Sequence, residues 1–255
     1  MTVLELQPGM IYGPIKSRRL GSSLGINLLP TTFKLCSFNC IYCHYGWTKE
    51  HSIEPKDHLA FLPSVQDVKE ALEKWLKNNY TRIDYITFSG NGEPTLHPQF
   101  LEIVESVKTV RDRYVPHVKL AILSNSSTLG IPSVRSALGK LDLRIMKLDC
   151  GTEECFDQIN RPCQKVRFED IVENLRTLDD FILQTIFLEG EVNNVSDSEI
   201  EKWIQKISYL KPKLVQIYTC DRPQARKGLS KVSKEKMGQI ATKAQEKTGI
   251  PVSVF

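Results

Sequence analysis

KLCSFNCIYCHYG, residues 34–46, places three cysteines, Cys36, Cys40 and Cys43, within eight positions of the chain. One short loop can therefore fold all three thiols around a single metal centre. A structural metal site usually takes four protein ligands, whereas a cluster held by three thiolates leaves one iron open for a substrate or cofactor. The stretch therefore predicts an iron–sulfur cluster with one open coordination position.

A closed zinc site is the alternative interpretation of the same stretch. It would add His44 as the fourth ligand beside the three cysteines. Adjacent side chains such as Cys43 and His44 project in divergent directions and rarely bind one ion together, so the spacing favours the cluster.

The composition is that of an ordinary globular protein. The chain has 255 residues, 41% of them hydrophobic and 25% charged, and no segment resembles a linker, so we expect one domain over residues 1–255. No apolar run is long enough to cross a bilayer, and the first residues lack the pattern of a signal peptide. Seven cysteines, an odd number, then favour thiol or metal chemistry in a reducing compartment, and we expect a cytoplasmic protein without a membrane partner.

Hydrophobic periodicity predicts six strands that alternate with helices. The expected strands are 23–30, 85–88, 118–123, 143–149, 181–188 and 214–219. The expected helices are 65–76 with Ser64 as its N-cap, 98–113, 131–139, segments reaching about 178, 197–209 and 233–247. Such alternation indicates a parallel sheet with right-handed crossovers. Six units are too few to close a standard barrel, so we predict an α/β fold that is an open, partial (β/α)6 barrel, with residues 47–62 as an irregular flap.

Polar segments follow three of the predicted strands, at the edge where a parallel α/β protein places its chemistry. Residues 90–94 read GNGEP, and glycines there allow the backbone to approach a small ligand closely. Residues 124–126 read SNS, which suits either a ribose diol or an ordinary turn. Lys147 and Asp149 share one face of the fourth strand, and charges pointing into a barrel mouth are costly unless they are paired or used.

The cysteine spacing, followed one strand later by Gly-x-Gly-Glu-Pro, resembles the radical S-adenosylmethionine (SAM) enzymes. The resemblance implies a [4Fe–4S] cluster on Cys36, Cys40 and Cys43, whose free iron binds SAM. An electron from a flavodoxin, ferredoxin or reductase would then release a 5'-deoxyadenosyl radical. It also implies that Tyr42 contacts the adenine and that Gly92 and Glu93 contact the methionyl end of SAM. From their side chains, Ser124 and Asn125 are candidates for the ribose, and Lys147 and Asp149 for the SAM carboxylate or the substrate.

The wyosine-synthase-related group, which modifies a tRNA base, is the branch that this chain resembles most. The resemblance covers residues 13–27, the cluster loop within residues 31–46, and residues 89–98, 147–149, 159–162 and 216–223. The synthases take the ligands of a second cluster from their N-terminal region, whereas no cysteine precedes Cys36 here. The resemblance therefore implies the class of enzyme rather than the wyosine reaction.

Three functions stay open at this point. The first is a radical SAM enzyme acting on RNA or a nucleoside, which the C-terminal basic segment, residues 222–255, also favours because six Lys and Arg residues fall within 222–236. The second is a radical SAM enzyme acting on a peptide or protein, such as a glycyl-radical activase. The third is a non-enzymatic zinc or iron–sulfur protein.

Four cysteines lie outside the cluster loop, namely Cys150, Cys155, Cys163 and Cys220. They could hold an auxiliary cluster, and Cys150 and Cys220, which follow the fourth and sixth strands, are candidate hydrogen-atom donors to a substrate radical. The alternative is that they are small buried hydrophobes. Arg161 is a candidate anion contact, with a surface salt bridge as its alternative.

Overall fold

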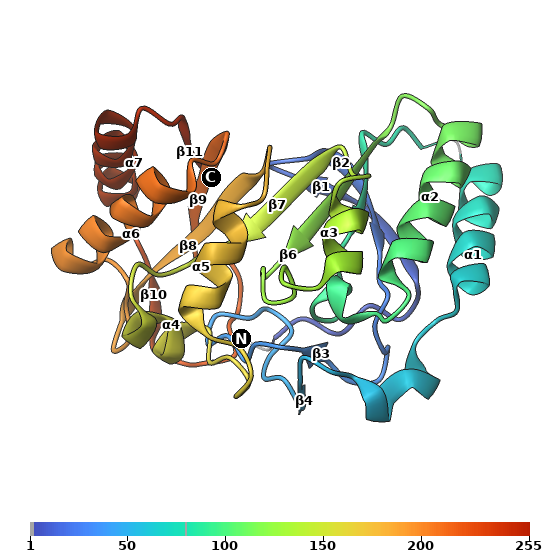
Figure 1. Cartoon of the computed structure of the whole chain (residues 1–255), viewed down its shortest axis with the longest axis horizontal. Helices are drawn as coiled ribbons and strands as arrows, with labels where there is room; N and C mark the ends of the chain where they lie inside the picture. Colours follow the sequence, from blue (N-terminus) through green and yellow to red (C-terminus); the bar gives the residue numbers. More distant parts are fainter. Residues whose placement is uncertain (1–2, 80) are drawn as a thin grey trace.

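The computed structural model describes residues 3–79 and 81–255, and one large sheet runs through them (Figure 1). Its strands, in spatial order, are β1 (Ile11–Ser17), β2 (Gly21–Ile26), β5 (Tyr85–Phe88), β6 (Lys119–Ser124), β7 (Leu143–Lys147), β8 (Ile182–Gly190), β9 (Leu214–Thr219) and β11 (Val252–Val254). All neighbours from β2 to β11 in this order are parallel, whereas β1 runs antiparallel to β2 and the short strand β10 (Leu229–Lys231) pairs antiparallel with β8. The predicted mostly parallel, open α/β sheet is thus confirmed.

Seven helices in the described part of the chain connect these strands. They are α1 (Val65–Asn78), α2 (Phe100–Tyr114), α3 (Pro132–Leu138), α4 (Glu153–Ile159), α5 (Phe168–Arg176), α6 (Asp197–Leu210) and α7 (Lys234–Thr248). Helices that follow one another mostly pack side by side, so α1 and α2 lie at one end of the molecule and α6 and α7 at the other (Figure 1). None of the helices among the described residues is long and apolar enough to span a bilayer.

The start of α1 shows why a helix begins where the sequence predicts. The Ser64 side chain accepts a hydrogen bond from the Asp67 backbone, and the Asp67 side chain accepts one from the Ser64 backbone. This reciprocal cap satisfies two N–H groups that a helix start leaves free. Val68 and Leu72 are then buried on the face that turns toward the core.

Several elements differ from the sequence prediction. The first predicted strand, 23–30, is too long, because the Asn27 side chain bonds the backbone of Leu29 and turns the chain after Ile26. β1 and β11 were not predicted, and neither were the short strands β10 (Leu229–Lys231), β3 (Leu35–Cys36) and β4 (Glu50–His51). The predicted flap contains β4 and a short 3-10 helix, η1 (Lys56–Phe61).

The two faces of the sheet bury different side chains. The larger apolar cluster includes Leu24 and Met146 together with the inward sides of the helices. A smaller cluster forms on the other face from Leu20, Ile145 and Ile182. Since side chains alternate along a strand, neighbouring positions of β7 reach opposite faces. The smaller cluster lies near the strands' amino ends, which leaves their carboxyl ends free for polar residues.

Leu20, in the turn between β1 and β2, tests this interior cluster. Leu20→Ala should lower the free energy of unfolding by about 2–4 kcal/mol, because Leu20 is only 5% exposed and the loss of its side chain would leave a cavity. Leu59→Ala is the matched control, since Leu59 is 52% exposed and its loss should cost at most about 0.5 kcal/mol. Urea unfolding followed by circular dichroism measures both, and equal effects would contradict the buried interior cluster.

Candidate functional site

The cysteine loop is fastened on one side to the GNGEP turn. Leu35 N–H donates to the Asn91 carbonyl at 3.2 Å, and Glu93 N–H donates to the Leu35 carbonyl at 3.2 Å. Gly92, with φ +152°, lies between them, and a Cβ at this position would come within 1.6 Å of the Leu35 oxygen. Only glycine permits this approach. The predicted contact of Gly92 with SAM stays a prediction.

The other side of the loop is fastened to residues 159–162. Asn39 N–H donates to the Asn160 carbonyl at 3.0 Å, and Ile41 N–H donates to the Ile159 carbonyl at 2.9 Å. The Asn160 amide also donates to Cys40 Sγ at 3.5 Å. The GNGEP turn and residues 159–162, which are distant in sequence, therefore hold the cysteine loop between them. This explains why both segments occur together with the cysteines in one chain.

The sulfurs of Cys36, Cys40 and Cys43 lie farther apart than a zinc site requires. Cys36 is buried, and Cys40 and Cys43 are partly buried. Among the described residues they do not form a group of ligand atoms within 4.8 Å of one another, whereas tetrahedral zinc with Zn–S of about 2.3 Å holds its sulfurs roughly 3.8 Å apart. The His44 imidazole Nδ1 lies 3.2 Å from the Pro223 carbonyl oxygen. The donor set thus fits a larger cluster better than zinc.

Polar groups around the sulfurs suit a charged cluster. The Asn125 amide donates to Cys36 Sγ at 3.6 Å, and the buried Lys34 donates to the Gly46 carbonyl at 2.7 Å. Burial by itself would lower the pKa of Lys34, but the neighbouring Cys43 and Cys36 raise it above its usual value. Hydrogen bonds and nearby charge set the reduction potential of such clusters. Sequence reasoning did not identify Lys34, although it stands two residues before the first cysteine.

Glu93 is the centre of a buried polar group that joins two of the predicted motifs. Its Oε1 accepts from Thr95 N–H at 3.1 Å and from the Ser124 hydroxyl at 3.0 Å, and its Oε2 accepts from Asn125 N–H at 2.6 Å. Burial raises the pKa of Glu93 despite these hydrogen bonds. The structure therefore brings Glu93, Ser124 and Asn125 together, and their contact with SAM stays a prediction.

Lys147 and Asp149 form a buried ion pair beside Tyr42. Lys147 Nζ lies 3.0 Å from Asp149 Oδ1 and donates to the Tyr218 hydroxyl at 2.9 Å, while the Tyr42 hydroxyl donates to Asp149. Burial would lower the pKa of Lys147, but Asp149 and Tyr218 together outweigh burial and the pKa is raised. The pairing therefore offsets part of the cost of taking these two side chains out of water.

The remaining predicted residues lie at separate places. Arg161 stacks 5.2 Å from the centre of the Trp47 ring. Cys150 Sγ is 2.8 Å from Cys155 Sγ, and Cys220 is buried directly after β9. Hydrogen-atom donation by Cys150 or Cys220 stays a prediction.

Arg19 is a residue of the barrel interior that sequence reasoning left unassigned. Its guanidinium lies 4.6 Å from the centre of the Tyr218 ring, and its Nη1 is buried with no hydrogen-bond partner among the described residues. Burial lowers the pKa of Arg19. Tyr218 also accepts from Lys147, so Arg19 lies one side chain away from the predicted SAM site.

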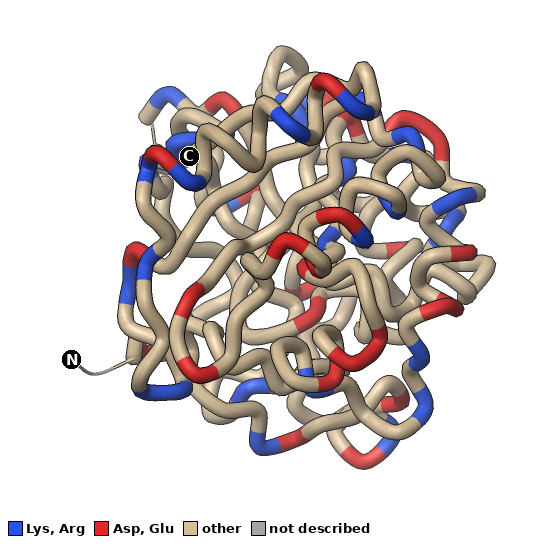
Figure 2. Tube along the Cα trace, turned by 90° about the vertical axis from the view of Figure 1, so that its left-hand side faces the viewer, with Lys and Arg blue, Asp and Glu red and all other residues tan. Residues whose placement is uncertain are grey.

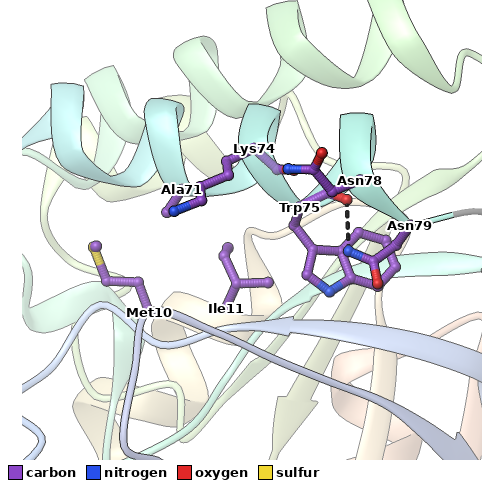
Figure 3. Close-up of a pocket in the computed structure, with 7 residues that line it drawn as sticks. All are labelled: Met10, Ile11, Ala71, Lys74, Trp75, Asn78 and Asn79. Atoms are coloured by element: carbon purple, nitrogen blue, oxygen red, sulfur yellow. Dashed lines mark hydrogen bonds between the residues drawn. The ribbon is translucent and has the colours of Figure 1, made fainter.

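A separate hollow of about 360 Å³ lies between α1 and the start of β1 (Figure 3). Met10 and Ile11 form one wall, and Trp75 of α1 lies opposite them. None of its lining residues belongs to the predicted site, so we assign it no part in the chemistry.

The family described as "Radical SAM superfamily" matches residues 31–207, which contain the cysteine loop, Glu93 and the Lys147–Asp149 pair. The chain belongs to the radical SAM superfamily. The family predicted from the cysteine spacing is thus confirmed, and membership implies SAM and an iron–sulfur cluster as the cofactors.

Related proteins match most of this radical SAM chain. A protein named GTPase Obg from Brachyspira hyodysenteriae is 32% identical over 99% of the chain, which covers 36% of that protein. A UPF0026 protein from Helicobacter pylori is 30% identical over 86% of the chain and 68% of its own length. The chain thus spans about a third of the first relative and about two-thirds of the second.

Solved structures share the fold of this radical SAM enzyme. A radical SAM methyltransferase from Sphaerobacter thermophilus has a TM-score of 0.67 at 12% identity, covering 91% of this chain and 65% of the other. TYW1 with a bound lysine–pyruvate adduct has a TM-score of 0.65 at 16% identity, covering 89% and 74%. At these identities the likeness extends to the fold, and it agrees with the predicted α/β fold of an open barrel.

Gly92→Ala tests the contact that fastens the loop. The new methyl group would displace the Leu35 carbonyl, so we expect loss of both backbone hydrogen bonds and at least a twofold lower iron content per chain after anaerobic reconstitution. Gly238→Ala is the control, because nothing lies within 4 Å of a Cβ there. Iron analysis and thermal unfolding measure the difference, and normal iron binding by Gly92→Ala would contradict the role of this contact.

Proposed function

We propose that this radical SAM enzyme binds a [4Fe–4S] cluster through Cys36, Cys40 and Cys43, cleaves SAM reductively and starts radical chemistry on RNA or a nucleoside. The observation that supports the first step is the fastening of the cysteine loop between Glu93 and Asn160. An external flavodoxin, ferredoxin or reductase would supply the electron. Seven free cysteines suit a reducing compartment, and we place the reaction in the cytoplasm.

Cys36, Cys40 and Cys43 would hold the cluster, which would supply the electron for the reductive cleavage of SAM. The residues of the chain hold the reactants and exclude water. Glu93 and Asp149 are each only 2% exposed, so charges placed there are shielded from solvent. Asn125 and Asn160 donate to the sulfurs of Cys36 and Cys40 and stabilise negative charge on them.

SAM is a zwitterion, and the polar groups beside the cysteines match its charges. The Glu93 carboxylate would accept from the methionyl ammonium, while Ser124 and Asn125 keep the carboxylate oriented. Lys147 would attract the SAM carboxylate or a substrate anion, and Asp149 fixes its ammonium. Tyr42 bonds Asp149, which positions the phenol ring for the adenine.

Cys40→Ala should abolish SAM cleavage while the fold remains. The variant lacks one cluster ligand, so production of 5'-deoxyadenosine should fall at least a hundredfold, as measured by chromatography after anaerobic reduction with dithionite. Cys163→Ala serves as the control and should keep full cleavage, because Cys163 lies outside the loop. Undiminished 5'-deoxyadenosine from Cys40→Ala would refute the assignment of the cluster ligands.

An anionic substrate is favoured by the cations beside the site. Arg19 has a buried Nη1 without a partner among the described residues, and Arg222 is exposed close to both Arg19 and His44. Guanidinium groups bind phosphate with two parallel hydrogen bonds. A phosphate of RNA beside Arg19 and Arg222 would bring a base toward the carboxyl ends of the strands.

The rest of the basic C-terminal segment contributes less to binding an anionic substrate. Arg226 pairs with Glu191 at 3.0 Å and Lys236 with Glu189 at 3.0 Å, and Asp221 pairs with Lys231. Figure 2 shows Lys and Arg interspersed with Asp and Glu over the side that carries α6 and α7. These pairs neutralise much of the charge that the sequence concentrates in residues 222–236.

A peptide or protein substrate is the second candidate. SuiB bound to its precursor peptide SuiA has a TM-score of 0.65 with this chain, and anSMEcpe bound to SAM (AdoMet) and a peptide has 0.57. Their identities to this chain are 11% and 15%, so the likeness extends to the fold. Two proteins of the same architecture therefore bind peptides.

Salt-dependent binding of bulk tRNA separates the two candidates. With about two phosphate contacts, affinity should fall roughly tenfold between about 50 and 200 mM salt. Replacing Arg19 and Arg222 by Gln should weaken binding several-fold and flatten this salt dependence. Fluorescence anisotropy in the presence of SAM measures both effects.

The control is Lys108→Gln, because Lys108 pairs with Asp112 on the outer helix α2 and should not affect RNA. Thermal unfolding checks that the variants fold. If tRNA does not bind at low salt, or if replacing the two arginines leaves tRNA binding unchanged, the RNA candidate is excluded and the peptide candidate remains.

A further inference from the structure

Two cysteines outside the cluster loop lie in direct contact. Cys150 follows Asp149 at the end of β7, and Cys155 lies in the first turn of α4. Their sulfurs are 2.8 Å apart, closer than two unbonded sulfurs ordinarily approach, and a disulfide bond needs about 2.05 Å. Both cysteines are reduced in this structure.

A metal ion is the competing explanation for this cluster. Cys150, Cys155 and Glu199 offer ligand atoms within 4.8 Å of one another. However, the Glu199 carboxylate already accepts from Gly151 N–H at 2.5 Å and from the Thr152 hydroxyl at 2.9 Å. Zinc would also need the sulfurs to separate to about 3.8 Å. Glu199 is thus engaged in fixing the loop between the two cysteines, and the sulfurs need only a small approach to bond.

We propose that Cys150 and Cys155 are a second redox site, which forms a reversible disulfide by exchange with low-molecular-weight disulfides. The loop that joins them is held at both ends, by Glu199 and by the Thr152 side chain that caps α4. The bond therefore closes without moving β7 or α4. This inference does not depend on the proposed substrate or on SAM cleavage.

The reaction balances as a two-electron exchange. The Cys155 sulfur, which is partly exposed, attacks one sulfur of the external disulfide, and the S–S bond there breaks to release the first thiol. The buried Cys150 sulfur then attacks Cys155 in the mixed disulfide, and a second thiol leaves. The two protein thiols lose two electrons and two protons, and the external disulfide gains them.

The surroundings of the two thiols set the pH dependence of their exchange with an external disulfide. Burial raises the pKa of Cys150 well above its usual value, and Asp149 and Glu199 raise it further. The contact with Cys150 lowers the pKa of Cys155, but burial and Glu199 outweigh it, so the pKa of Cys155 is also raised. Because the thiolate is the attacking form, exchange should be faster at pH 9 than at pH 7.

The pair lies next to the predicted cluster ligands. Cys150 Sγ is 3.9 Å from Asn160 Oδ1, and the amide nitrogen of the same Asn160 donates to Cys40 Sγ and to Asp149. Only the Asn160 side chain therefore separates Cys150 from Cys40. A disulfide at Cys150 would form one side chain away from a predicted cluster ligand.

Peptide mapping of the cluster-loaded protein tests the pair. Trypsin should release residues 148–165 as one peptide, since Pro162 protects the bond after Arg161, and this peptide contains Cys150, Cys155 and Cys163. After equilibration with excess reduced glutathione, iodoacetamide should modify all three cysteines. After excess oxidised glutathione it should modify Cys163 alone, and the peptide should be two hydrogens lighter before reduction.

Three variants make the result specific. Cys163→Ser should retain the disulfide, whereas Cys155→Ser should leave Cys150 alkylated or joined to glutathione, and Cys150→Ser should do the same for Cys155. Three alkyl groups at every glutathione ratio would overturn the proposal, and so would a disulfide to a different cysteine. One equivalent of zinc that is lost in Cys155→Ser would also overturn it and assign a metal site. Since the map does not use SAM, failure here leaves the proposed function standing.

Discussion

The absence of a side chain at Gly92 fixes the geometry of the whole site. Because the Leu35 carbonyl occupies the space of the missing Cβ, the cysteine loop lies directly on the turn that carries Glu93. A loop of this kind loses much conformational entropy when it is ordered, and backbone hydrogen bonds on both of its sides offset that loss. The predicted cluster ligands and Glu93, which we propose binds the methionyl group of SAM, are thereby held as one unit.

The open barrel supports this unit by separating apolar and charged layers. Leu20, Ile145 and Ile182 close the interior near the amino ends of the strands, and Lys147 continues β7 toward the carboxyl ends. A lysine that is mostly removed from water is costly without a partner, so its pairing with Asp149 stabilises the folded chain at this position. β7 thus contributes Ile145 to the apolar core and Lys147 to the proposed chemistry.

The sequence predicts best what depends on local pattern. Strands β5 and β9 and the cap at Ser64 follow from periodicity and capping rules, and the cysteine spacing indicates the family. β1 was missed because it pairs antiparallel in a segment interrupted by glycine and proline. The contact of Arg19 with Tyr218 was missed because it depends on how the turn after β1 meets the far end of the sheet. Such long-range proximity has no signature in either local segment.

Asn160 shows how such proximity produces a single polar network. Its side chain donates to Asp149 at 2.8 Å and to Cys40 Sγ at 3.5 Å, and its carbonyl accepts from Asn39. An amide has few donors, and each one here binds a group from a different part of the chain. Because Asn160 also ends α4, a displacement of that helix would alter the hydrogen bond to Cys40. The position of α4 and the electronic environment of Cys40, a predicted cluster ligand, are therefore physically linked through one side chain.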